Sequence, residues 1–353
     1  MIKPLTSLRF FFAICVFLSH YSINGNVLFT EGYIGVEFFF ILSGFILTYN
    51  YKQRLINKQI TNREFYIARF ARIYPLHLLL LLFVVLLTLI RIIRHSGIFH
   101  YDQFIANALL LQSFIPNRDF YFSFNAVSWS ISDEMFFYAL FPFIISFICQ
   151  FTKQYLISCV TIGLICYIVM TLLIPEGWQH ALFYINPVFR IYDFTIGIGL
   201  YYVWEKLKDH RPVVFRKIIL TGIEIISIGL LVIMVIISKN IPQVFRYASY
   251  YWIPMSLIIL VFARPSNGGI HTVLSWKPFV VLGEISFGFY MLHQKIIEMI
   301  SLNLKKIYVD LPEGIIFILI LSLVLFASFL SFYFFEKRMN LLIKKCMRIT
   351  LCQ

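Results

Sequence analysis

Two ionisable residues, Arg9 and His20, interrupt the first hydrophobic stretch of the chain. Eleven positions separate them, which on an α-helix corresponds to about three full turns, or about 16 Å along the axis. Both side chains are therefore expected on one helical face. An ionisable side chain inside an apolar helix costs about 2.5 kcal/mol or more, so its presence usually indicates function. The spacing predicts a polar track through the interior of a protein.

A second group of ionisable residues opens the apolar stretch that begins near residue 127. Asp133 fits the preference of helix N-termini for negative charge. Glu134 and Tyr138 are four positions apart, so they share a helical face and are better placed to line an interior. A carboxylate that orients a histidine stabilises the imidazolium formed when the histidine captures a proton. Our hypothesis is that Glu134 pairs with His20.

Arg69 and Arg72 lie three positions apart, shortly before Pro75. On a helix they share a face and are able to hold a phosphate group through bidentate hydrogen bonds. Arginines that precede a membrane helix also anchor it and determine its orientation. Spacing alone favours the anchoring role.

Three further candidates lie in other apolar segments. Glu37 is a secondary functional candidate because its carboxylate is costly to bury. Gly44, in the same apolar segment, permits close helix packing. Arg190 is followed three positions later by Asp193, and an ion pair within one helix is as plausible as a functional role. His293 is a second histidine in a predicted membrane helix.

The composition indicates that these residues belong to an all-α, polytopic membrane protein. The chain has 353 residues, of which 60% are hydrophobic and 13% charged, with a mean hydropathy of +0.83. The first apolar run is interpreted as a membrane helix and not as a cleavable signal peptide. The run 104–115 is too short to span a bilayer and is expected to lie at its surface or re-enter. Hydropathy predicts about ten spans: 5–24, 33–50, 74–94, 126–149, 155–174, 183–204, 217–237, 246–263, 280–301 and 314–335.

The distribution of basic residues predicts the orientation of the chain. The net charge is +13, but the basic residues lie mostly between apolar runs, so topology and lipid contact explain them better than nucleic acid does. They concentrate in two alternate loops and the tail: Lys52, Arg54, Lys58, Arg63, Arg69 and Arg72; Lys206, Lys208, Arg211, Arg216 and Lys217; Lys337, Arg338, Lys344, Lys345 and Arg348. The positive-inside rule then places both termini in the cytoplasm, Arg9 toward the cytoplasmic side and His20 toward the outside. The six cysteines show no metal-ligand spacing, and no metal site is predicted.

Five segments in order resemble the membrane-bound acyltransferase-3 family. The resemblance covers almost the whole chain, although the usual second glutamate of the fourth segment is Met135 here. The segments are Arg9 with His20; the apolar run Phe38 to Phe45; Arg69 and Arg72 with Pro75; Trp129 to Glu134; and Ser286, Tyr290 and His293.

The resemblance implies a transmembrane acyltransferase domain over residues 1–340, followed by a short basic cytoplasmic tail over 341–353. It implies transfer of an acyl group, commonly acetyl, from acetyl-CoA as co-substrate to a sugar hydroxyl of a cell-surface polysaccharide or glycolipid. No permanently bound cofactor is expected. In such an enzyme His20 and Glu134 are central, and Arg69 and Arg72 contact the CoA donor. Arg9 is left with three possible roles: binding phosphate, polarising the thioester, or pairing with a carboxylate such as Glu37. His20 is left as either general base or transient acyl carrier.

The main alternative is a transporter or flippase of a lipid-linked sugar that uses His20, Glu134 and Arg190 as a proton relay. The ordered set of motifs favours the enzyme. The expected partners are acyl-CoA, a glycan or lipid-linked sugar acceptor and membrane lipid, without nucleic acid. The expected location is a bacterial inner (cytoplasmic) membrane, crossed several times. Within the enzyme interpretation, a small molecule, peptidoglycan or a protein is an alternative acceptor to a glycan. The sequence specifies neither the oligomeric state nor the hydroxyl that is modified.

Overall fold

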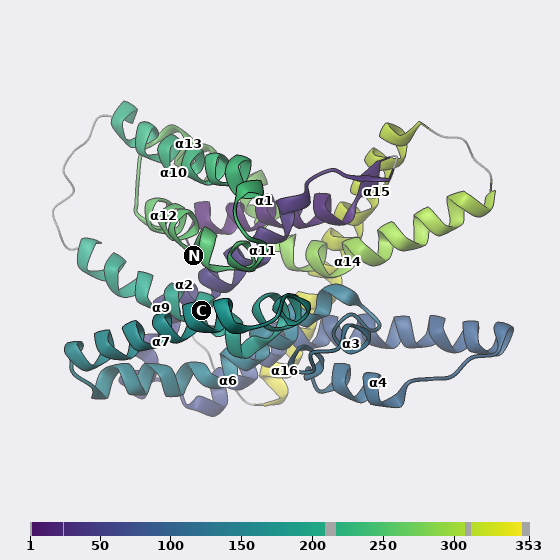
Figure 1. Cartoon of the computed structure of the whole chain (residues 1–353), viewed down its shortest axis with the longest axis horizontal. Helices are drawn as coiled ribbons and strands as arrows, with labels where there is room; N and C mark the ends of the chain where they lie inside the picture. Colours follow the sequence, from purple (N-terminus) through teal and green to yellow (C-terminus); the bar gives the residue numbers. More distant parts are fainter. Residues whose placement is uncertain (1, 24, 209–216, 308–311, 348–353) are drawn as a thin grey trace. The chain divides into compact units, whose positions relative to one another are not determined.

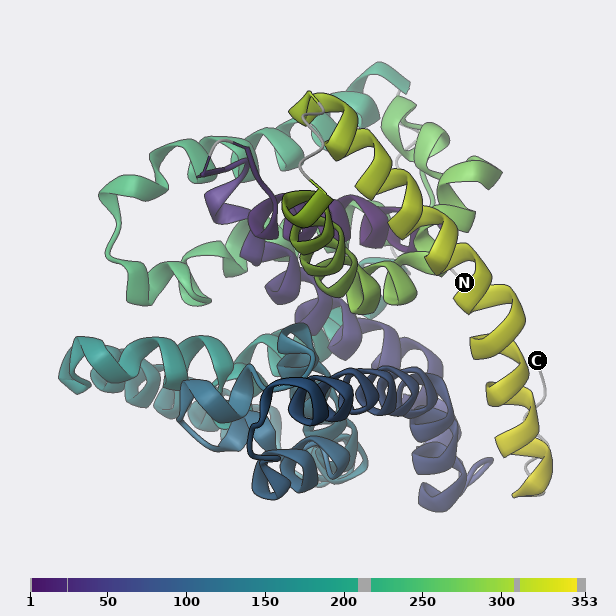
Figure 2. The ribbon, with the colours of Figure 1, turned by 90° about the vertical axis from the view of Figure 1, so that its right-hand side faces the viewer.

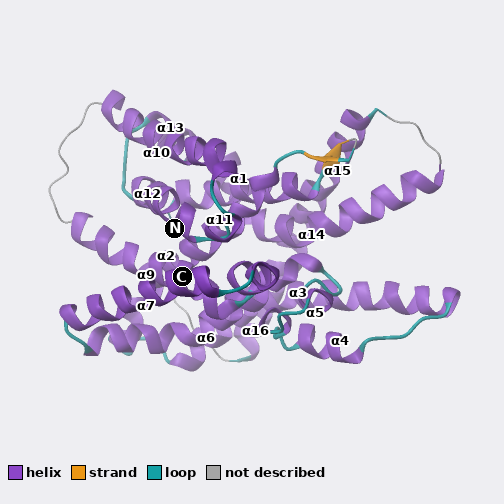
Figure 3. Cartoon of the chain, in the orientation of Figure 1, coloured by secondary structure: helices purple, strands orange, loops and turns teal. Residues whose placement is uncertain are grey.

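The computed structural model describes residues 2–23, 25–208, 217–307 and 312–347 (Figure 1). Within these ranges the chain is almost entirely helical, and one short hairpin contains the strands (Figure 3). This confirms the all-α prediction. The chain divides into two compact units. Unit 1 comprises Met1–Phe39, Tyr202–Ser238 and Ile253–Leu341, and unit 2 comprises Phe40–Tyr201, Lys239–Trp252 and Leu342–Gln353.

Unit 1 is built around α1, which contacts α14, and α14 in turn contacts α15. The elements α15, η7 and α16 follow one another without a break in the helical backbone (Figure 2). The elements that lie wholly or mainly in unit 1 are α1 (Lys3–His20), β1 (Ser22–Ile23), β2 (Asn26–Val27), η1 (Thr30–Tyr33), α10 (Lys217–Ile237), α12 (Trp252–Ala263), α13 (Gly269–Leu274), α14 (Lys277–Ile307), α15 (Glu313–Leu330) and the π-helix η7 (Ser331–Glu336). The helix α16 (Lys337–Cys346) is divided equally between the two units, and η5 (Ser238–Asn240) lies mainly in unit 2.

Unit 2 holds most of the long central helices and the short elements between them. In this unit α3 contacts α6, and α6 contacts η2. Its elements are most of α2 (Ile34–Ile56), α3 (Asn62–His95), α4 (Tyr101–Ala108), η2 (Gln112–Phe114), α5 (Arg118–Tyr121), η3 (Ala126–Ser128), α6 (Trp129–Gln150), α7 (Lys153–Leu173), α8 (Glu176–Gln179), the π-helix η4 (His180–Ile185), most of α9 (Pro187–Lys208), α11 (Gln243–Arg246) and η6 (Ser249–Tyr251).

Six helical segments in the described part of the chain are long and apolar enough to cross a membrane. They are Thr30–Ile56, Asn62–His95, Ala126–Gln150, Lys153–Leu173, Lys217–Asn240 and Glu313–Cys346. The other four predicted spans fall on α1, α9, α12 and α14. Because α12 has 12 residues, it is about 18 Å long, shorter than a hydrocarbon core of about 30 Å. The six segments fit a multi-pass membrane protein, whereas the predicted number of ten is not confirmed.

Several predicted spans differ from the observed helices in their bounds, and three of the differences have a clear local cause. The span 5–24 ends at His20, because Tyr21 is extended and leads into the hairpin, where Gly25 adopts a positive φ of 79°. The span 74–94 begins twelve residues earlier, because Thr61 and Glu64 form a capping box and the helix continues through Pro75. The span 246–263 is not one helix, since short turns precede α12.

Parts of two predictions lie outside the described residues. Arg211 and Arg216, used for the orientation, fall in the undescribed range 209–216, and Arg348 falls in the range 348–353, the last part of the predicted tail. The helix α16 runs across the predicted boundary at residue 340. The segment 104–115 contains the end of α4 and the short η2, without a continuous helix.

Close backbone contacts fix two helix crossings. In unit 1, Gly283 of α14 lies against the backbone carbonyl of Thr6 in α1, where a Cβ atom would clash. In unit 2, Gly44 of α2 lies against the carbonyl of Phe194, and Gly197 of α9 lies against that of Ile41. Small residues at such crossings allow helix backbones to approach closely. The packing role predicted for Gly44 is therefore confirmed.

The start of α6 is held by a buried polar network in unit 2. The hydroxyl of Ser132 donates to the Leu110 carbonyl at 2.5 Å and lies 2.6 Å from the Ser113 hydroxyl. The Gln112 amide donates to the Ser128 carbonyl at 3.1 Å. These groups are buried, so their hydrogen bonds replace those that water would make. The network connects the segment after α4 to the start of the motif segment Trp129 to Glu134.

Candidate active site

Helix α1 places Arg9 and His20 as the sequence predicted. The helix is continuous from Lys3 to His20, so the two residues share one face. Arg9 is half-buried in the middle of the helix, whereas His20 is exposed at its last position. A terminal, exposed imidazole is accessible to a reacting molecule, which suits a histidine that exchanges protons.

The His20 ring contacts a second histidine, His293 of α14. Their ring nitrogens, His20 Nδ1 and His293 Nε2, are 2.9 Å apart, and the two rings stack with centroids 5.1 Å apart. The other nitrogen of His293, Nδ1, lies 2.6 Å from the Tyr290 carbonyl oxygen. His293 is fully buried. The sequence singled out both histidines but did not predict that they meet.

Aromatic side chains surround the buried member of this pair. The ring of His293 lies 6.2 Å from that of Phe17, 6.3 Å from that of Phe289 and 5.8 Å from that of Tyr290. Phe17 and Phe289 belong to a hydrophobic cluster shared by α1, α14 and α15. This packing fixes the orientation of His293, and through it that of His20.

The predicted partner of His20, Glu134, lies in unit 2. It is half-buried in α6 and interacts electrostatically with Asp133 and with Tyr138, one turn further along the helix. The shared face predicted for Glu134 and Tyr138 fits this interaction. Since His20 lies in unit 1, its pairing with Glu134 stays a prediction. Asp133, read from the sequence as a helix-end charge, is instead fully buried.

Glu37 lies on α2 at the end of unit 1, and its side chain is 1% exposed. Intramembrane carboxylates are costly to bury, so the reason for considering this residue functional holds. Its pairing with Arg9 stays a prediction.

Arg69 and Arg72 both lie on α3, and two tyrosines hold Arg69. Its Nη2 atom donates to the Tyr51 hydroxyl at 2.7 Å, and its guanidinium lies 4.8 Å from the Tyr51 ring centre and 6.0 Å from that of Tyr138. Arg72 is exposed one turn further along. Lys344 of α16 interacts electrostatically with both arginines. We call Arg69, Arg72 and Lys344 the basic cluster; the sequence predicted only its two arginines as a pair.

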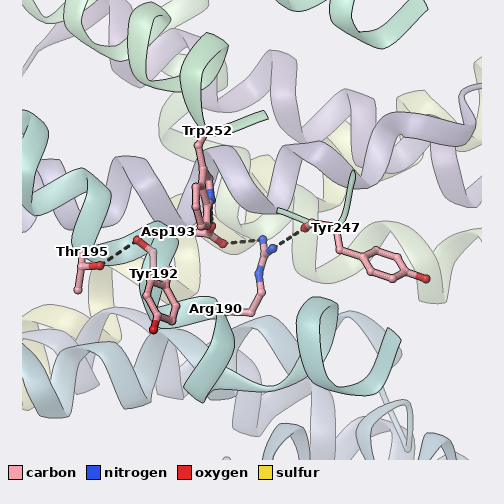
Figure 4. Close-up of polar contacts among 6 residues, drawn as sticks. All are labelled: Arg190, Tyr192, Asp193, Thr195, Tyr247 and Trp252. Atoms are coloured by element: carbon pink, nitrogen blue, oxygen red, sulfur yellow. Dashed lines mark hydrogen bonds and ion pairs between the residues drawn. The ribbon is translucent and has the colours of Figure 1, made fainter. Parts of the chain in front are cut away.

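The predicted pair of Arg190 and Asp193 forms an ion pair in α9 (Figure 4). Arg190 Nη2 lies 2.9 Å from Asp193 Oδ2, and both side chains are fully buried. Arg190 Nη1 donates to the Tyr247 carbonyl at 2.5 Å, and Trp252 Nε1 donates to Asp193 Oδ1 at 2.5 Å. Each charged group thus has a second partner in the segment that leads into α12, with Tyr247 before that helix and Trp252 at its first position. This pattern supports a structural role for the pair in joining α9 to that segment.

The arrangement gives two kinds of chemistry. The His20–His293 pair offers a proton acceptor, and the basic cluster offers an anion-binding surface. The part of the chain that the structure describes contains no group of three or more His, Cys, Asp or Glu side chains that could hold a metal ion.

Comparison with known proteins identifies the family of this chain. Residues 4–335 match the model of the family described as "Acyltransferase domain". The chain is 29% identical over 324 residues to acyltransferase MdmB of Streptomyces mycarofaciens, covering 84% of this chain and 79% of that protein. It is 26% identical over 291 residues to peptidoglycan O-acetyltransferase OatA of Listeria monocytogenes, covering 76% of this chain but only 45% of that longer protein. No solved structure gives a significant match. Because the family match extends over nearly the whole chain, this protein belongs to the membrane acyltransferase family that its motifs indicated.

Proposed function

We propose that this chain is an O-acyltransferase that moves an acyl group, most simply acetyl, from cytoplasmic acyl-CoA to a sugar hydroxyl at the cell surface. The observation that carries the proposal is the exposed His20 imidazole, held by His293, in a chain of the acyltransferase family. Membership of that family favours acyl transfer over transport of a lipid-linked sugar.

His20 supplies the general base. A sugar hydroxyl is a weak nucleophile, and a histidine suits the task because imidazole exchanges protons near neutral pH. The hydroxyl oxygen attacks the thioester carbonyl carbon while its proton passes to the imidazole. The C–S bond then breaks, the ester remains on the sugar, and the proton leaves with the CoA sulfur. Glu134 and Arg9 are proposed to assist through charge, as predicted from the sequence.

The basic cluster is proposed to hold the CoA donor. The nucleotide end of CoA is highly anionic, and an arginine fork matches phosphate geometry. Arg69 is suited to this role because Tyr51 already orients its guanidinium, and Arg72 is exposed beside it. Lys344 adds a third positive charge. This assignment requires the cluster to face the cytoplasm, as the proposed arrangement of ten spans and two cytoplasmic termini places it.

The acceptor is proposed to be a cell-surface glycan. One relative is named a peptidoglycan O-acetyltransferase, which makes peptidoglycan the first acceptor to test and other polysaccharides or glycolipids the next. The proposed location, a bacterial cytoplasmic membrane, brings a cytoplasmic donor and an external acceptor to opposite faces of one protein.

Mass spectrometry of cell-surface glycans tests the proposal. A strain carrying the gene should show sugars heavier by one acetyl group than a strain lacking it. A deletion strain complemented with His20→Ala serves as the matched control and should resemble the deletion strain. Identical glycans in all three strains would contradict the proposal.

A further inference from the structure

We propose that His293 is a positioning residue that fixes the tautomer of His20, so that the outer nitrogen of His20, Nε2, carries the reactive lone pair. This inference rests on the proposed function for its kinetic consequence only.

His293 contacts the backbone through its Nδ1 atom. A carbonyl oxygen only accepts hydrogen bonds, and His293 Nδ1 lies 2.6 Å from that of Tyr290. His293 Nδ1 must therefore carry a proton and donate it. A neutral imidazole has one N–H, so Nε2 of a neutral His293 is a bare acceptor.

The surroundings of His293 determine its charge. Its side chain is fully buried, and the rings of Phe17, Phe289 and Tyr290 lie around it. An imidazolium in that apolar shell would require a counter-charge that these rings do not supply. His293 is therefore assigned as neutral.

The protonation state of His293 determines the tautomer of His20. Since His293 Nε2 is a bare acceptor 2.9 Å from His20 Nδ1, His20 Nδ1 must carry the proton of this hydrogen bond. The one remaining nitrogen of a neutral His20, Nε2, then holds the lone pair. When Nε2 accepts a substrate proton, the Nδ1–H bond to His293 becomes charge-assisted and stabilises the imidazolium. The hydrogen bond from His20 Nδ1 to His293 also prevents the His20 ring from exchanging the roles of its two nitrogens as donor and acceptor.

Two variants test the role of His293. Leu at this position fills a similar volume but cannot accept a hydrogen bond, whereas the Gln side-chain oxygen lies near the position of Nε2 and can. We expect His293→Leu to lower kcat about 10- to 100-fold with unchanged KM for donor and acceptor, because a charge-assisted hydrogen bond is lost. His293→Gln should retain kcat to within a few-fold.

The matched control is His77→Gln. His77 is also buried and also contacts a backbone carbonyl, that of Asn107, at 2.9 Å, but it lies in unit 2. The His77→Gln substitution should leave kcat unchanged. A His293→Leu variant with wild-type kcat, or a folded His293→Gln variant as slow as His293→Leu, would overturn the proposal.

A second measurement does not depend on acyl transfer. Nitrogen NMR of the protein labelled with ¹⁵N-histidine, in lipid bilayers, distinguishes the two neutral tautomers of a ring. The His20 signal, identified by its loss in His20→Gln, should show a protonated Nδ1 and a bare Nε2, and this state should be lost in His293→Leu. A His20 with bare Nδ1 in the wild-type protein would overturn the tautomer assignment. If glycan acylation were absent while the tautomer were as expected, the proposed function would fail and this inference would stand.

Discussion

The buried ion pair of Arg190 and Asp193 gives a prediction whose size follows from the contacts (Figure 4). In the wild type, Trp252 Nε1 donates a hydrogen bond to the Asp193 carboxylate at 2.5 Å. In Asp193→Asn, the amide oxygen can still accept this hydrogen bond. The guanidinium, however, loses the carboxylate oxygen that lies 2.9 Å from Nη2. Both side chains are fully buried, so the charge of Arg190 would stay in the interior. Removing one partner of a buried pair costs about 3–5 kcal/mol of unfolding free energy.

A double variant separates the pair from other effects. Arg190→Met with Asp193→Asn removes both charges and keeps similar volume, which is often close to neutral for a buried pair. The lost hydrogen bond from Arg190 Nη1 leaves the Tyr247 carbonyl without this donor, at a cost of about 1–3 kcal/mol. The double variant should therefore be more stable than Asp193→Asn alone.

The assay is reversible unfolding by sodium dodecyl sulfate in mixed micelles, followed by circular dichroism. The same titration of the wild type, both single variants and the double variant completes a mutant cycle, which isolates the coupling between the two residues. Asp193→Asn within about 1 kcal/mol of the wild type, or a double variant as unstable as the sum of the singles, would refute the structural role.

Two other predictions concern the donor and the helix crossing. Replacing Arg69 and Arg72 together with Gln should raise KM for acetyl-CoA roughly 10- to 100-fold and leave KM for the acceptor unchanged, as measured by initial rates in membranes; unchanged donor KM would return both to an anchoring role. Lys344→Gln should have a smaller effect in the same direction, and an effect on acceptor KM alone would exclude it from the basic cluster. Gly44→Ala should lower the unfolding free energy by about 1–3 kcal/mol in the detergent titration, because the added Cβ atom meets a facing backbone carbonyl. The control Gly199→Ala should not lower it, because the added Cβ atom there meets open space. Equal stability of the two variants would contradict the close crossing.

Local sequence patterns predicted what lies within one helix. The shared face of Arg9 and His20 depends only on the period of the helix, and the structure contains that helix without interruption. The ion pair of Arg190 and Asp193 spans three positions and was likewise predictable. Its complete burial was not, since burial depends on which segments cover α9.

Long-range contacts were beyond the sequence pattern. His20 and His293 are 273 positions apart, and periodicity indicates which face of a helix is apolar but not which other helix packs there. The sequence pattern also did not predict that Lys344 belongs to the basic cluster, because α16 is remote from α3 in sequence. Hydropathy also failed to predict where some helices begin and end. The capping box at Thr61 starts α3 ahead of polar residues that hydropathy alone would not place in a membrane helix.

The central claim, that His20 acts as the base of an acyl transfer, is tested most directly by radiolabel transfer. Membranes containing the wild type or His20→Ala, at equal amounts of inserted protein, are supplied with [¹⁴C]acetyl-CoA and a cell-wall glycan acceptor. The wild type should label the glycan, and His20→Ala should be slower by about 10²- to 10⁴-fold, the usual contribution of a general base. Labelling by His20→Ala at the wild-type rate would contradict the claim.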